Sequence, residues 1–275
     1  MKIDSHQHFW KFDPVRDSWI NEEMKIIQRD FLPADLEPLL KQHGFDGSVV
    51  VQSDQSMEEN RFQLENAANN DFIKGVVGWV DLVSLDLEKD LEYLSQFPKF
   101  KGVRHVLQGE LQRDLMLQPA FMRGISHLQK HNLTYDILIY KDQLQYLPAF
   151  VSMFPEQRFV IDHLAKPDIR SGELSEWKKG IENMAAFENV YCKISGMVTE
   201  ADWQNWKTED FKPYLDTVVE TFGTKRIMFG SDWPVCLVAA SYEKMLGIVK
   251  DYFSTFSDDD RQDFFGLNAT RFYNL

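Results

Sequence analysis

The sequence predicts an α/β protein in which eight parallel strands, each followed by a helix, close into a (β/α)8 TIM barrel. Short runs rich in β-branched residues alternate with longer stretches of helical periodicity, and this unit occurs eight times. No composition break or flexible linker divides the chain, so we expect one domain over residues 1–275. A doubly wound open sheet is the alternative, but it would carry a glycine-rich loop after its first strand, where this chain has His6-Gln7-His8.

The expected strands are the β-branched runs that end in polar loops. They cover Lys2–His8, Gly47–Ser53, Lys74–Leu82, Lys101–Leu107, Thr134–Tyr140, Arg158–His163, Val190–Ser195 and Arg226–Ser231. The expected helices cover Asp35–Gln42, Glu58–Asn69, Asp86–Gln96, Pro119–Lys130, Asp142–Phe154, Glu173–Phe187, Lys212–Phe222 and Ser241–Phe253, with a closing helix over Asp258–Phe265. The first helix has clear boundary signals, because Pro33 precedes it and Gly44 follows it. Strict alternation of strand and helix predicts parallel strands covered by helices.

An unusually long segment, Phe9–Pro33, separates the first strand from its helix. It contains Trp10, Phe12 and Trp19, which is a high aromatic content for a connecting loop. Two interpretations are compatible with this content and with each other. The segment is an ordered loop over the barrel mouth, or it is a packed structural insertion.

Composition and charge restrict the possible partners. The formal net charge of −13 repels nucleic-acid phosphates and anionic lipids, which favours a small-molecule substrate over nucleic acid or membrane. The sequence shows no signal peptide and no apolar run long enough to span a bilayer. Cys192 and Cys236 form no CxxC pair and lie in apolar surroundings, so we expect buried free thiols and a cytoplasmic protein. The oligomeric state is not encoded in any of these features.

Four titratable residues stand where predicted strands end. His6 and His8 point to the same side of the first strand, since side chains alternate along a strand. His163 and Asp232 each follow an apolar run, at the ends of the sixth and eighth strands. Taken singly, His163 fits a core histidine equally well, and Asp232 fits a turn or a helix cap. Because barrel enzymes build their active sites at this end of the strands, the four residues together predict an active site.

Five motifs make the chain similar to a known family. They lie at residues 4–10 (DSHQHFW), 101–105 (KGVRH), 162–167 (DHLAKP), 191–196 (YCKISG) and 230–234 (GSDWP). In this combination the sequence resembles the amidohydrolase superfamily, in the branch with sugar-lactone (L-fuconolactone and L-rhamnonolactone) and 2-pyrone-4,6-dicarboxylate lactonases. The resemblance covers essentially the whole chain. It implies an amidohydrolase-like barrel, a lactone hydrolase of carbohydrate metabolism, and catalytic positions at His6, His8, His163 and Asp232.

The chain also departs from the wider superfamily in its metal ligands. Many members carry a metal-bridging lysine on the fourth strand and a histidine at the end of the fifth, where this chain has Arg104-His105 and Tyr140. A binuclear metal centre is therefore not expected. Two alternatives stay open for metal use. In the first, His6, His8, His163 and Asp232 hold one divalent ion such as Zn²⁺ or Mn²⁺; in the second, the enzyme works without metal.

These residues support a mechanistic hypothesis for lactone opening. Asp232 acts as general base on water, while His6, His8 and His163 polarise the carbonyl, directly or through a metal. The candidate substrate-binding residues are Arg104, Gln52, Tyr140, Lys166, Trp10, Trp79 and Trp233. Arg104 and its neighbour His105 should face opposite ways, and we favour Arg104 for the pocket. The alternatives are a metal-dependent decarboxylase of an unsaturated acid on the same barrel, a metal-dependent nuclease and a catalytically inert sugar-binding barrel.

Overall fold

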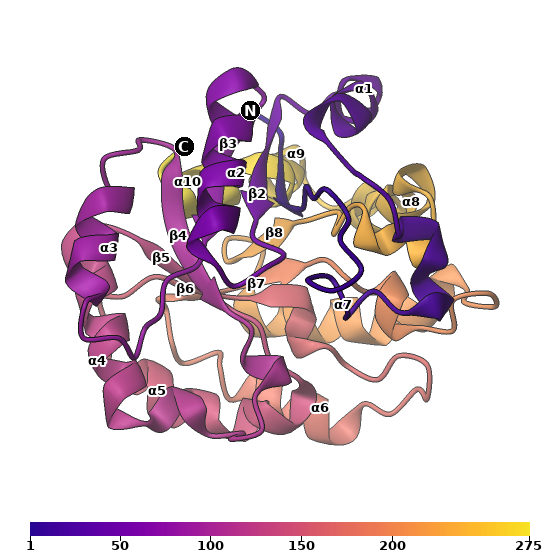
Figure 1. The fold of residues 1–275 in the computed structure, drawn as a ribbon. Helices are drawn as coiled ribbons and strands as arrows, with labels where there is room; N and C mark the ends of the chain where they lie inside the picture. Colours follow the sequence, from indigo (N-terminus) through magenta and orange to yellow (C-terminus); the bar gives the residue numbers. More distant parts are fainter.

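The computed structural model describes residues 1–275 and contains the predicted barrel of parallel strands (Figure 1). Its sheet has eight strands in the order β1 to β8, each paired in parallel with the next. The strands are β1 (Ile3–Gln7), β2 (Gly47–Val51), β3 (Ile73–Gly78), β4 (Phe100–His105), β5 (Thr134–Ile137), β6 (Phe159–Ile161), β7 (Val190–Ile194) and β8 (Ile227–Phe229). The (β/α)8 prediction is therefore confirmed.

Helices connect successive strands and pack outside the sheet (Figure 1). They are α1 (Pro33–His43), α2 (Met57–Asn69), α3 (Leu87–Leu94), α4 (Pro119–Leu128), α5 (Leu147–Ser152), α6 (Ser175–Glu182), α7 (Thr208–Phe222), α8 (Tyr242–Tyr252), α9 (Asp258–Gln262) and α10 (Asn268–Tyr273). Local chemistry sets several of their ends. The Ser56 and Ser241 hydroxyls cap α2 and α8, and Gly44 ends α1 in a left-handed conformation with φ 72°.

Hydrogen bonds between the two ends of the chain close the barrel. The His8 N–H donates to the Trp233 carbonyl at 2.7 Å, and the Asp232 N–H donates to the His6 carbonyl at 2.8 Å. The Ser5 hydroxyl donates to the Phe229 carbonyl at 2.6 Å. These bonds place the end of β1 directly beside the turn that follows β8. At the opposite end, α10 packs its Phe272 against apolar side chains of the barrel interior.

Several strands end earlier than the sequence predicts. The fifth stops at Ile137 instead of Tyr140, the sixth at Ile161 instead of His163, and the eighth at Phe229 instead of Ser231. Backbone conformation explains the difference at the last two. Residues 163–166 all have φ between 51° and 56°, and Asp232 has φ 55°. Left-handed residues cannot continue an extended strand, so the chain turns at the barrel rim, where its polar side chains gather.

The helix predictions also need correction. The segment predicted over Asp142–Phe154 is a 3-10 turn over Lys141–Tyr146 followed by α5, because Pro148 suits only the first turn of an α-helix. The helix predicted over Glu173–Phe187 is shorter in the structure, where only α6 (Ser175–Glu182) is helical. The closing segment continues through a π-helical turn, Asp263–Leu267, into α10.

The long segment after β1 combines both predicted roles. Trp10 and Phe31 exchange backbone hydrogen bonds of 3.0 and 2.9 Å, and both side chains are buried. A 3-10 helix over Glu22–Ile27 lies between them. Arg16 and Trp19 of the same segment line the cavity at the barrel mouth. The segment is thus packed internally and also forms part of the site wall.

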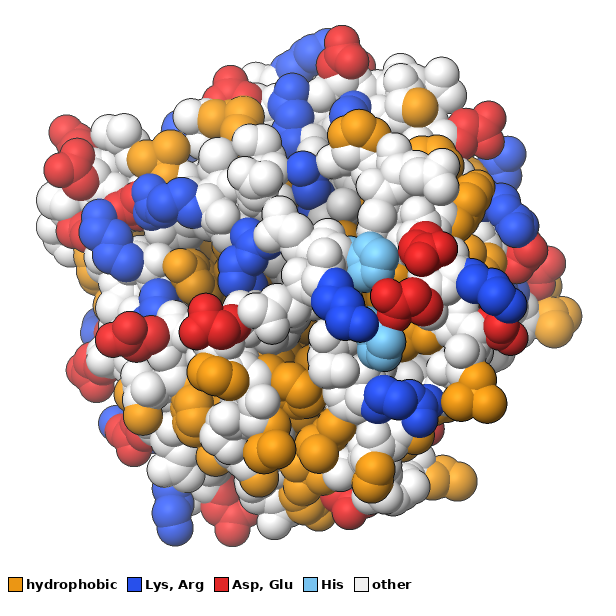
Figure 2. Space-filling view, turned by 90° about the vertical axis from the view of Figure 1, so that its left-hand side faces the viewer, with side chains coloured by type: hydrophobic (Ala, Val, Ile, Leu, Met, Phe, Trp, Pro, Cys, Tyr) orange, Lys and Arg blue, Asp and Glu red, His pale blue; other side chains and the backbone are white.

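The cysteines are buried, and the surface carries charges of both signs (Figure 2). Cys192 and Cys236 are buried and free, as predicted. No helix of the structure combines the length and the apolar character required to cross a bilayer. On the flank turned to the viewer in Figure 2, acidic and basic side chains are interspersed, with histidines beside acidic groups. His127 and His131 contact Glu88 between α3 and α4, away from the site.

Candidate active site

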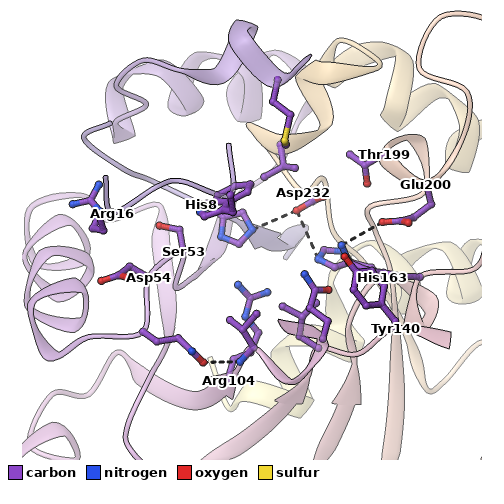
Figure 3. A pocket seen from close by; sticks show the side chains of 18 of the residues that line it. His8, Arg16, Ser53, Asp54, Arg104, Tyr140, His163, Thr199, Glu200 and Asp232 are labelled. Carbon is purple, nitrogen blue, oxygen red and sulfur yellow. Dashed lines mark hydrogen bonds and ion pairs between the residues drawn. The ribbon is translucent and has the colours of Figure 1, made fainter. Parts of the chain in front are cut away.

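One cavity of about 560 Å³ opens where the strands end. The loops after six strands, β2 and β4 to β8, contribute to its wall, and so does the segment after β1. Representative lining residues are His8, Ser53, Tyr140, His163, Thr199 and Asp232 (Figure 3). Loops at the carboxyl ends of barrel strands are where such folds bind and transform small molecules.

The tautomer of His8 is fixed by its hydrogen bond. Its Nδ1 lies 2.8 Å from the Val51 carbonyl, which can only accept, so the ring proton is on Nδ1. The Nε2 lone pair then faces Asp232 Oδ1 at 3.3 Å (Figure 3). A lone pair and a carboxylate repel each other at this distance. The contact is favourable only when a proton or a cation lies between the two atoms.

His163 is held by its backbone and by two neighbours in the segment that follows β7. Its Nδ1 lies 2.8 Å from the Ser195 hydroxyl, which leaves Nε2 directed at Asp232 Oδ1 at 3.8 Å. Gly196 packs against the ring, and a Cβ there would come within 2.6 Å of His163 Nδ1. Only glycine therefore fits beside this imidazole.

His6 lies deepest of the three and is fully buried. Its Nδ1 is 3.3 Å from Asp162 Oδ1 and 3.3 Å from Lys193 Nζ, while its Nε2 is 4.0 Å from Asp232 Oδ1. Burial, reinforced by Lys193, lowers the pKa of His6 well below 6.5 despite the nearby Asp162. Burial likewise lowers the pKa of His163, although Asp232 opposes the shift.

Asp232 is the point on which the three rings converge. Burial by itself would raise its pKa, but contacts with His163 and His8 outweigh burial and lower the pKa below the usual carboxyl value. The left-handed backbone of Asp232 and its N–H bond to the His6 carbonyl aim the carboxylate inward. The structure therefore brings together an ionised carboxylate, the imidazoles of His6 and His163, which burial keeps neutral, and the imidazole of His8.

The donor set fits a single divalent cation. His6, His8 and Asp232 each offer one ligand atom, and these atoms lie within 4.8 Å of one another. The His8 Nδ1 bond to a backbone carbonyl is typical of metal-binding histidines, because it presents a neutral Nε2 to the ion. Nitrogen and carboxylate donors suit Zn²⁺. His6, Asp162 and His163 form a second group of the same kind, so His6 is common to both.

Beneath the histidines lies a buried charge network that the sequence reasoning did not assign. Lys193 Nζ contacts Asp136 Oδ2 at 2.5 Å and Asp162 Oδ1 at 3.1 Å, and all three side chains are fully buried. Arg104 Nη1 contacts Asp162 Oδ2 at 3.1 Å, and Tyr273 of α10 donates to Asp136. A lysine inside the apolar run of β7 was the available signal, because such a position is buried and a buried ammonium needs acidic partners.

The predicted polar contacts of the substrate fall into two groups. Arg104, Tyr140 and Lys166 line the cavity. His105 faces away and pairs with Glu110 at 2.8 Å, so the structure places Arg104, not His105, on the pocket side. Gln52 is buried behind the wall, where it donates to the Arg104 carbonyl at 3.2 Å and supports the arginine rather than lining the cavity.

The predicted aromatic contacts need correction, because Trp10, Trp79 and Trp233 do not line the cavity. Trp10 and Trp233 pack edge-to-face on the buried Phe31, and the backbone of Trp79 is held by Asn60. Trp10 and Trp233 are buried core residues, whereas Trp79 is partly buried. The tryptophans that line the cavity are Trp19 and Trp203, both from long loops. Glu200 and Asp54 also line it, and no strand pattern marked them.

Comparison with known proteins agrees with this geometry. A family model described as Amidohydrolase matches residues 3–275. The chain is 38% identical to an L-fucono-1,5-lactonase of Burkholderia ambifaria, with 100% of this chain and 96% of that protein covered. It is 37% identical to an L-fucono-1,5-lactonase of Burkholderia multivorans, again covering 100% and 96%. A zinc-bound crystal structure of an amidohydrolase from Burkholderia multivorans superposes with a TM-score of 0.97 at 36% identity, covering 100% of this chain and 99% of that one.

Proposed function

The chain belongs to the amidohydrolase family and is a lactone hydrolase, and from this premise we propose that it opens a six-carbon deoxy-sugar lactone with Asp232 as general base. The observation that supports this role is the convergence of three imidazoles on one ionised carboxylate at a cavity. Asp232 Oδ1 lies 3.3, 3.8 and 4.0 Å from the Nε2 atoms of His8, His163 and His6. The names of the relatives supply the substrate class.

In this mechanism Asp232 takes a proton from water as the water oxygen bonds to the lactone carbonyl carbon. The ring C–O bond then breaks, and Asp232 returns the proton to the departing alkoxide, which leaves the open hydroxy acid. His163 donates to the developing oxyanion from Nε2 when the Ser195 hydroxyl donates to Nδ1. His8 cannot donate from Nε2 in its fixed tautomer, so it serves as a ligand or a proton acceptor. A divalent cation held by His6, His8 and Asp232 would supply Lewis acidity toward the carbonyl oxygen.

A panel of neutral sugar lactones tests the reaction class. A pH indicator records acid release, with parallel assays in the presence and absence of a chelator. We expect acid release from 1,5-lactones of deoxy-sugars, and the chelator arm measures how much a bound cation contributes to the rate. Binding of lactones without turnover would instead indicate a sugar-binding barrel, and carbon dioxide release from an acid substrate would indicate a decarboxylase.

The pKa shifts of the site predict the pH profile. Activity requires Asp232 ionised, and its lowered pKa keeps it ionised in neutral and mildly acidic buffer. His6 and His163 must be neutral, and their pKa values lie well below 6.5. We therefore expect kcat/KM to be flat from pH 6.5 to 8, after correction for spontaneous lactone hydrolysis, and to fall only in more acidic buffer. A half-maximal point above pH 6.5 would contradict this assignment of charges.

Zinc binding provides a second prediction. We expect protein dialysed against Zn²⁺ to retain about one equivalent, measured by mass spectrometry of the metal content, and a His8→Gln variant to retain at least about tenfold less at limiting zinc. His105→Gln is the matched control, because this histidine pairs with Glu110 outside the cavity and should leave zinc content unchanged. Equal zinc retention by both variants would remove His8 from the ligand set.

A further inference from the structure

An ion pair forms part of the cavity wall near His163 and Asp232 (Figure 3). Lys166 Nζ lies 3.3 Å from Glu200 Oε1, and the two side chains are 17% and 21% exposed. Both residues line the cavity, and Figure 3 marks the contact with a dashed line that ends on Glu200. The ammonium also lies 5.6 Å from the centre of the Tyr140 ring. The pair is therefore accessible to a ligand although both side chains are largely shielded from solvent.

The other cations of the cavity are also neutralised. Arg16 Nη2 contacts Asp17 Oδ2 at 2.7 Å, and that carboxylate is 2% exposed. Arg104 Nη1 contacts Asp162 Oδ2 at 3.1 Å, and the Arg104 Nη2 donates to the Gln52 carbonyl. No basic side chain that lines the cavity is without a carboxylate partner. A substrate carboxylate would thus have to displace an existing acidic partner.

The chemistry of the Lys166–Glu200 pair suits hydroxyl groups. The ammonium donates hydrogen bonds and the carboxylate accepts them, so the pair can bind two neighbouring hydroxyls of one sugar and remain neutral overall. A carboxylate at the same place would be repelled by Glu200 and would compete with it for Lys166. Rejection by a repulsive element is a common basis of specificity.

We propose that Lys166 and Glu200 together select uncharged polyhydroxy lactones and reject lactones that carry a free carboxylate. This inference rests on the proposed lactonase function and names its substrate class more narrowly. Glu200 is the specificity-determining residue, because it both accepts from the sugar and cancels the charge of Lys166.

The test compares two lactones that differ in one group. Galactono-1,4-lactone and galactaro-1,4-lactone share the ring, but the second has a carboxylate in place of the terminal CH2OH. Their inhibition constants are measured against the best neutral substrate of the lactone panel. For Glu200→Gln we expect KM for the neutral substrate to rise about tenfold with kcat little changed, and galactarolactone to bind about tenfold tighter.

Two further variants keep the result interpretable. Lys166→Met should weaken neutral lactones while galactarolactone stays weak, because the ammonium is gone. Glu182→Gln removes a carboxylate from the exposed Lys178–Glu182 pair on α6. It should change neither the KM of the neutral substrate nor the inhibition constant of galactarolactone. If Glu200→Gln shifts both lactones equally, or shifts neither, the selection role is wrong although the enzyme is still a lactonase. If the unmodified protein opens no lactone, the proposed function itself fails.

Discussion

Replacing Asp232 by Asn is expected to lower kcat by at least about 10²-fold, because the amide cannot accept the proton of the attacking water. Asparagine has the same size as aspartate and tolerates a left-handed backbone, which matters at φ 55°. The N–H bond from this residue to the His6 carbonyl is kept as well. The loss should therefore appear in turnover and not in folding, and steady-state kinetics with a thermal melt separate the two.

The matched control is Asp142→Asn. Asp142 pairs with Arg113 on the surface, where an exposed pair contributes little, so this variant should retain normal kinetics. Near-normal kcat in the Asp232 variant would assign the base to another group. A simultaneous collapse of the melting temperature would show that the carboxylate is structural.

Replacing Lys193 by Met is expected to cost about 3–5 kcal/mol of unfolding free energy, the usual penalty for removing one partner of a buried ion pair. Asp136 and Asp162 would lose the ammonium that both contact, and neither can reach water. Burial already raises the pKa of Asp136 to about 6 with Lys193 present. Denaturant unfolding, followed by fluorescence, measures the loss.

The dependence of this loss on pH has a definite sign. Without the ammonium, the folded protein holds a proton on Asp136 more tightly than the unfolded chain does, so the variant loses further stability as pH rises from about 4 through 6 and above. A double variant, Lys193→Met with Asp136→Asn, should recover part of the loss. Lys178→Met on the exposed face of α6 should cost at most about 0.5 kcal/mol. If Lys193→Met were as stable as Lys178→Met, Lys193 would not stabilise the buried carboxylates of Asp136 and Asp162.

The part of the site that could be predicted from the sequence lies at the ends of strands. His6 and His8 stand at the end of the first predicted strand, His163 and Asp232 follow apolar runs, and the carboxyl ends of parallel barrel strands meet at one rim. The positions of these residues at strand ends suffice for the prediction, and the structure brings the four side chains together. The alternation of side chains also places Arg104 and His105 on opposite sides, although it could not decide which of them faces inward.

Which loop residues line the cavity could not be predicted from the sequence in the same way. Trp19, Trp203 and Glu200 line the cavity from segments with no periodicity, so nothing in their spacing indicates a direction. Trp10 lies next to the histidines in sequence, yet its indole donates to the Arg29 carbonyl at 2.8 Å and packs in the core. Strand ends were overestimated for a related reason, since the sixth predicted strand extends to His163, whose backbone has already turned to φ 52°.

The hydrogen bonds between residues 6–8 and residues 232–233 have a consequence for biosynthesis. His6 and His8 are translated more than two hundred residues before Asp232, the proposed base. A nascent chain can therefore bring these side chains together only after its last strand has emerged and docked against its first. Recovery of turnover after denaturation is accordingly expected to report the docking of these two segments.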